Sequence, residues 1–151
     1  MRSRSDDVPA GLAVERALTL GLCGLGGRLD SPPSSLAEAV AAGGAQHDER
    51  LAGRIARFAA APLGAYVWTK DADGMLWLGR LVGHWQYDAG PRAHDVDLVH
   101  VRQCAWLRDP VPDADAPAAV HATFRRGGRN WQRIHAIEIG EETAVLWNRP
   151  R

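Results

Sequence analysis

The chain has 151 residues, of which 46% are apolar and 24% charged, the balance of a globular protein long enough to bury a core. Its 18 basic and 18 acidic residues cancel, which argues against the broadly basic surface of a non-specific nucleic-acid-binding protein. Two cysteines are too few for a disulfide framework, and no apolar run approaches the ~20 residues of a membrane span. We therefore expect a cytoplasmic protein with one domain and no membrane partner.

The first 61 residues are predicted to be mainly helical. Residues 1–11 are polar and charged, which is typical of a disordered lead-in, and the domain itself is expected to span 12–151. The glycine-rich apolar segment 20–27 is too short for a helix and is predicted to be a buried strand. Helices are predicted at 12–19, 36–42 and 49–61. In the third helix three arginines share one face, separate from the apolar face: Arg50, Arg54 and Arg57.

From residue 64 the pattern becomes that of β-strands. Segments 64–69 and 75–82 flank an Asp-x-Asp-Gly loop and are predicted to form a hairpin, and Gly83 permits a kink before the strand continues over 84–87. The remaining predicted elements are a loop at 88–95, a strand at 97–107, a helix at 117–124, a basic loop at 126–130, a strand at 131–135 and a helix at 140–147. We therefore expect an α+β domain built on a five- to six-stranded β-barrel with flanking helices.

The chain carries no recognisable set of catalytic or metal-binding residues. The glycines of 21–27 do not form a dinucleotide-binding loop, because Pro32 and Pro33 follow where the phosphate-binding helix would begin. The six histidines lack zinc-ligand spacing, no serine lies in a G-x-S-x-G turn, and Cys104 lies inside a predicted strand as a buried apolar residue. The sequence predicts a protein that is not an enzyme and holds no metal or cofactor.

Aromatic residues gather in the β-rich part of the chain. Trp68, Trp85 and Tyr87 stand beside polar residues near strand ends, where their rings could stack a flat ligand such as a nucleobase at ~1–3 kcal/mol per base. The alternative is that these rings only pack the barrel. Trp77 and Trp106 have apolar neighbours and are predicted to be core residues.

Two polar features have two interpretations each. His100 shares a strand face with Arg102, so it is either a ligand-binding group or a satisfied core histidine. The segment 125–130, Arg-Arg-Gly-Gly-Arg-Asn, combines charge with flexibility, as phosphate contacts require, or it is a solvated loop.

The order of several motifs resembles the PUA-like superfamily, above all its EVE-type branch, which is related to YTH domains. The resemblance covers about residues 20–147 and is carried by Gly79, Leu81, Gly83, Trp85 and Tyr87, then His100, Arg102, Cys104 and Trp106, and then the segment 128–134. It implies a pseudo-barrel that flips a modified base out of a duplex and holds it in an aromatic pocket. The chain departs from many relatives at Gly26-Gly27-Arg28, where they carry an aromatic residue.

On this resemblance we expect a DNA-binding reader of a modified base, with 5-methylcytosine as the first choice and duplex DNA as the partner. Nucleic-acid contacts are assigned to Arg28, Arg125, Arg126, Arg129 and Asn130. The base pocket is assigned to Cys23, Gly24, Trp68, Trp85, Tyr87, His100 and Arg102. A separate effector protein is a further expected partner. The alternatives are an RNA-binding module, or a barrel that binds a small molecule or a protein and no nucleic acid.

Overall fold

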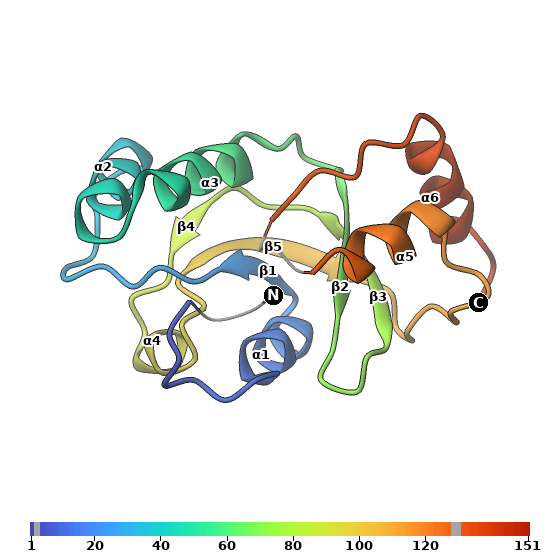
Figure 1. The fold of residues 1–151 in the computed structure, drawn as a ribbon, viewed down its shortest axis with the longest axis horizontal. Coiled ribbons are helices and arrows are strands. Elements are labelled where there is room, and N and C mark those ends of the chain that lie inside the picture. The colour runs from blue at the N-terminus through green and yellow to red at the C-terminus, as the bar shows by residue number, and fades with distance from the viewer. Residues whose placement is uncertain (2–3, 128–130) are drawn as a thin grey trace.

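A curled antiparallel sheet forms the centre of the computed structural model, which describes residues 1, 4–127 and 131–151. Its described strands are β1 (Leu22–Leu25), β2 (Tyr66–Lys70), β3 (Leu76–Leu81), β4 (Gln86–Tyr87) and β5 (His100–Trp106). They run in the order β1-β5-β3-β2, with β4 also paired to β5. The described strands thus curl into half a barrel, with β1 and β2 at its edges (Figure 1). The expected α+β architecture is confirmed at this level.

Strand β1 confirms the strand predicted within residues 20–27. It pairs antiparallel with β5, with Leu22 opposite Gln103. Gly21 separates β1 from the preceding helix, since its left-handed backbone (φ 64°) ends that helix and its N–H donates to the Ala17 carbonyl. Gly24 is required by close packing, because a Cβ there would lie 2.5 Å from the His100 carbonyl oxygen.

Gly83 lies at a bulge between β3 and β4. Both strands pair with the same edge of β5, and the N–H groups of Val82 and Gly83 both donate to the Gln103 carbonyl, at 2.9 and 3.3 Å. Two residues therefore face one, which bends the strand where the sequence predicts a kink. This bend directs β4 toward the first residue of β5.

Helices cover both faces of the sheet (Figure 1). They are α1 (Leu12–Leu20), α2 (Leu36–Gln46), α3 (Glu49–Ala60), α4 (Pro91–Asp95), α5 (Ala118–Arg125) and α6 (Ile139–Trp147). Ser35 caps α2 by accepting from Glu38 N, and Asp48 caps α3 by accepting from Leu51 N, so both helices begin where the sequence predicts. The short helix α4 replaces the expected loop at 88–95, with Pro91 in its first turn.

Buried side chains form three clusters. Cluster A lies between α3 and one sheet face and contains Cys23, Leu25, Leu51, Ile55, Phe58, Val67, Leu81 and Cys104. Cluster B lies under α5 and α6 and contains Leu76, Leu78, Val111, Ala116, Val120 and Leu146. Cluster C lies under α1 and contains Ala13, Ala17, Leu98 and Val101.

The strand predicted at 131–135 is wrong, because these residues pair with no described strand. Trp131 has a left-handed backbone (φ 55°), which an extended strand does not allow. Its ring instead packs edge-on against Phe58 of α3, with centroids 4.8 Å apart. A tertiary contact therefore overrides the local strand pattern.

Part of the segment 1–11, expected to be a disordered lead-in, packs on the domain. The backbone N–H of Arg4 donates to Asp97 Oδ2 at 2.8 Å, and its guanidinium lies 3.1 Å from Asp48 Oδ2. The side chain of Met1 packs against clusters A and C. In the part of the chain that the structure describes, no helix combines the length and the apolar character of a transmembrane span.

Candidate functional site

Three aromatic rings from the predicted pocket meet where β4 pairs with β5. His100 begins β5, Tyr87 lies opposite it in β4, and Trp85 precedes β4. The Trp85 and His100 rings are stacked with centroids 6.1 Å apart, and Tyr87 lies edge-on to His100 at 5.4 Å. We call these three residues the His100 cluster. The bend at Gly83 brings them together, because it returns the chain to the edge of β5.

Two buried polar atoms of this cluster have no hydrogen-bond partner among the described residues. His100 Nε2 lies 2.9 Å from the Gly27 carbonyl, so this nitrogen carries the proton and donates. The other ring nitrogen, Nδ1, is then a bare acceptor, and it is buried without a partner, as is the indole donor Trp85 Nε1. The Tyr87 hydroxyl has a partner, since it accepts from Leu29 N at 3.0 Å. The cluster therefore holds one unused acceptor and one unused donor.

The imidazole of His100 is kept neutral by its surroundings. Burial lowers its pKa, while the Gly27 carbonyl and Asp97 raise it and His47 lowers it. The side chain is completely buried. A neutral ring preserves Nδ1 as an acceptor, which the charged form would lose.

Cys23 and Gly24 lie beside the His100 cluster, but their polar groups add little to what the cluster can bind. Cys23 belongs to cluster A, and burial raises its pKa to about 12, so it is a thiol and not a thiolate. The Gly24 N–H donates to Met1 Sδ at 3.3 Å. The backbone N–H of Gly24, a residue assigned to the base pocket from sequence, is thus already hydrogen-bonded within the fold.

Arg102 connects the parts of the fold that surround the site. Only 1% of it is exposed, and its guanidinium donates to the carbonyls of Gly83, Phe58 and Ala61 at 2.8, 2.9 and 2.6 Å. Two of these carbonyls lie at the C-terminal end of α3, where the helix dipole favours a cation. Arg102 therefore fixes α3 to the Gly83 bend through hydrogen bonds to backbone carbonyls, and its guanidinium also lies 6.0 Å from the centroid of the Phe58 ring.

Trp68 lies away from the other predicted pocket residues. Neighbouring Val67 belongs to cluster A, so the alternation of a strand directs Trp68 to the opposite face, where it packs on cluster B. Its indole N–H donates to Thr143 Oγ1 of α6 at 3.4 Å. Trp68 thus connects β2 to α6.

The residues predicted to bind nucleic acid differ in their exposure and in their contacts with the rest of the fold. Arg125 and Arg126 are exposed at the end of α5, and Arg126 donates to the Ala122 carbonyl at 3.3 Å. Arg129 and Asn130 lie outside the described residues. The Arg28 guanidinium is engaged by the fold: it donates to the carbonyls of His94 and Asp95 and lies 3.4 Å from Asp7 Oδ1.

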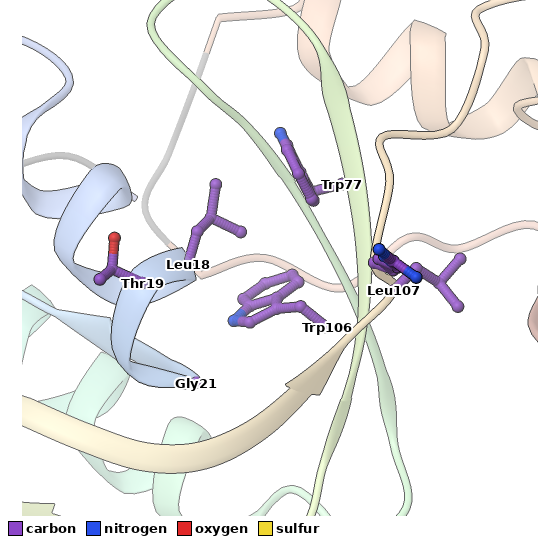
Figure 2. Close-up of a pocket in the computed structure, with 7 residues that line it drawn as sticks. Leu18, Thr19, Gly21, Trp77, Trp106 and Leu107 are labelled. Carbon is purple, nitrogen blue, oxygen red and sulfur yellow. The ribbon is translucent and has the colours of Figure 1, made fainter.

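A cavity of about 480 Å³ lies elsewhere, between α1 and the ends of β3 and β5. Figure 2 shows Leu18, Trp77 and Trp106 around a common space. The complete lining is Leu18, Thr19, Gly21, Trp77, Trp106, Leu107 and Arg108. Each indole N–H here has a protein acceptor: Trp77 donates to Asp71 Oδ2 at 2.8 Å and Trp106 donates to the Leu22 carbonyl at 3.0 Å.

Trp77 and Trp106 are predicted from the sequence to be core residues, and the cavity that they border is not predicted. Both are half-buried and both border it. The missed signal is position, since Trp106 ends its strand just before Arg108 and Trp77 follows the acidic hairpin loop. Position near a strand end is also the criterion that selects Trp85 and Tyr87 as candidate ligand contacts, and Trp77 and Trp106 meet it too.

Within the described ranges, no three histidine, cysteine or carboxylate side chains are grouped so as to hold a metal ion. The chain matches no family model, no curated protein and no solved structure. The resemblance to the PUA-like superfamily therefore depends on the sequence motifs alone.

Proposed function

We propose that the protein is a DNA-binding module that holds one modified base, flipped out of the duplex, against the His100 cluster. The observation that supports this function is a pair of buried atoms, His100 Nδ1 and Trp85 Nε1, for which the described residues supply no hydrogen-bond partner. Buried polar groups are nearly always hydrogen-bonded, and one left unsatisfied costs about 1–3 kcal/mol. An acceptor and a donor beside stacked rings are the chemistry that a base edge satisfies.

Cytosine fits this pair better than thymine does. Its exocyclic N4 amino group is a donor and can bond His100 Nδ1, while its ring acceptors can take the Trp85 N–H. Thymine has an oxygen in place of that amino group, which would oppose the lone pair of Nδ1. A methyl group at C5 would add contact with Trp85 or Tyr87, and one such carbon gives about 1–3 kcal/mol of discrimination.

The exposed guanidinium groups of Arg125 and Arg126 support the proposal as phosphate contacts. Such contacts position the duplex and carry no information about the base. Selection of the base is therefore assigned to the His100 cluster alone.

The test is fluorescence anisotropy with duplexes of one sequence that carry cytosine, 5-methylcytosine, 5-hydroxymethylcytosine or thymine at one position. We expect the tightest binding to a modified-cytosine duplex. Trp85→Phe keeps a ring but removes the donor, and we expect about tenfold weaker binding, the equivalent of one hydrogen bond. The matched control is Trp77→Phe, which removes an indole donor outside the cluster and should leave binding unchanged.

Equal binding of all four duplexes, or no loss of affinity in Trp85→Phe, would contradict the proposal. The same titration with single-stranded and duplex RNA of the matching sequence tests the closest alternative. Tighter binding to RNA than to every DNA would make the chain an RNA-binding module.

A further inference from the structure

The base contacts proposed for the His100 cluster do not involve the arginines of α3, although these arginines lie on one side of the helix. Arg50, Arg54 and Arg57 follow one another at intervals of four and three residues, so their side chains leave the same side of the helix. This stripe borders the buried face made by Leu51, Ile55 and Phe58. We call these three arginines the α3 arginine stripe.

Local geometry sets the direction of the Arg57 guanidinium. The Arg57 side chain folds back along the helix, since its Nη1 lies 3.0 Å from where a Cβ of Gly53 would be. It therefore points toward the turns that carry Arg54 and Arg50. Like charges at this spacing destabilise a helix, and among the described residues neither Arg50 nor Arg57 forms an ion pair. The side chains of Arg50 and Arg57 are both exposed, and the charge of Arg50 contributes to lowering the pKa of nearby Asp48.

The stripe adjoins the core that carries the His100 cluster. Arg57 precedes Phe58, whose ring contacts Trp131 at 4.8 Å. Trp131 and Trp85 both pack against cluster A, to which Phe58 belongs. Arg102 fixes the end of α3 to the bend that precedes Trp85. Cluster A and Arg102 thus join α3, which carries the stripe, to the segment that carries the His100 cluster.

We propose that the α3 arginine stripe binds the sugar–phosphate backbone of the strand whose base enters the His100 cluster. Seven residues of helix place Arg50 and Arg57 about 10 Å apart along the axis. One DNA strand carries about three phosphates over that length, and guanidinium groups match phosphate oxygens. The proposal rests on the proposed function, and it adds a contact surface on a different helix from Arg125 and Arg126.

The test is the salt dependence of binding by the double variant Arg50→Gln, Arg57→Gln. We expect the slope of log K against log salt to become shallower by about 0.9 per lost contact, or about 1.8 in all. The loss of affinity should be equal for modified and unmodified duplexes, because phosphate contacts carry no base information. The matched control is Arg92→Gln, Arg151→Gln, which removes the same charge from two exposed arginines on other parts of the chain.

Every other outcome contradicts the stripe proposal, and one of them contradicts the proposed function as well. An unchanged slope with intact selection of the modified base would contradict the stripe proposal but not the proposed function. An equal change of slope in the control variant would do the same. A loss confined to the modified duplex would also overturn it, because the stripe would then be reading the base. If the unaltered protein binds neither DNA nor RNA at low salt, or binds only anionic vesicles, both proposals are wrong. Thermal melting of each variant ensures that folded protein is compared.

Discussion

The His100 cluster and the cavity of Figure 2 both place large aromatic rings near the ends of strands of the same sheet, yet they differ in their hydrogen bonds. In the cavity, Trp77 and Trp106 each donate to a protein acceptor, so their rings offer a ligand carbon surfaces. In the cluster, Trp85 Nε1 and His100 Nδ1 have no partner among the described residues. The cavity offers space, whereas the cluster offers unmet hydrogen bonds, and only the second kind of site specifies what it binds.

The largest effect that separates the two regions is expected from truncating Trp106. Its ring packs against Gly79 and Cys104, and its N–H joins β5 to the Leu22 carbonyl of β1. Trp106→Ala should lower the free energy of unfolding by about 3 kcal/mol or more, measured in urea. It should leave any preference for a modified duplex unchanged in the folded fraction. Equal loss of stability in Trp85→Ala would show that both regions are core.

Two glycine substitutions test the same difference between the cavity and the His100 cluster, because each places a methyl group against one of the two regions. A Cβ at Gly79 would lie 2.6 Å from the Trp106 ring, and one at Gly24 would lie 2.5 Å from the His100 carbonyl. Gly79→Ala and Gly24→Ala should each cost about 1–3 kcal/mol through overpacking. Only Gly24→Ala should also weaken base binding, because it displaces His100. If Gly79→Ala weakens binding as well, the cavity takes part in recognition.

Replacing each indole with phenylalanine compares a satisfied donor with an unsatisfied one. Trp106→Phe removes a bond to the Leu22 carbonyl and should cost about 1 kcal/mol more than the change in ring volume alone. Trp85→Phe removes a donor without a described partner, so this additional cost should be absent. Chemical denaturation of both variants, with ligand omitted, gives the comparison. A similar extra cost at both positions would mean that Trp85 Nε1 has a partner in the free protein.

The smallest effect is expected from pH. The pKa of His100 is lowered in the fold, so below its ordinary value of 6.5 the unfolded chain binds more protons than the native protein. Stability should therefore be complete above that pH and decline as the pH falls through it. His100→Gln should remove this decline, measured by urea unfolding between pH 8 and pH 5. A wild-type midpoint that stays constant over this range would contradict the assignment of a neutral buried imidazole.

Most helices and strands could be predicted because their signals are local. Ser35 and Asp48 are side-chain caps, and Gly21 ends α1, so each boundary depends on a few neighbouring residues. The false strand at 131–135 shows the limit of such signals. Trp131 is held by Phe58, more than seventy positions away, and no local pattern contains that contact.

The candidate site was predictable only in part, for a related reason. The alternation of residues near β4 and the start of β5 brings Trp85, Tyr87 and His100 together as expected. Alternation does not say which face of a strand meets which helix, so it could not separate Trp68 from them. Nor could the sequence show that the Arg102 guanidinium donates to three backbone carbonyls, because these carbonyls belong to two distant segments.

The pairing of β1 with β5 has a consequence for how the chain folds. It joins residues about 80 positions apart, so β1 has no strand partner until most of the chain exists. At ribosomal rates of roughly 5–20 residues per second, that interval is roughly 4–16 seconds during synthesis. Contacts between such distant residues also slow the folding of a complete chain, because a long loop must close first. The apolar segment Leu22–Leu25 consequently stays without its β5 partner for that interval, and an unpaired apolar strand is prone to pair with another chain.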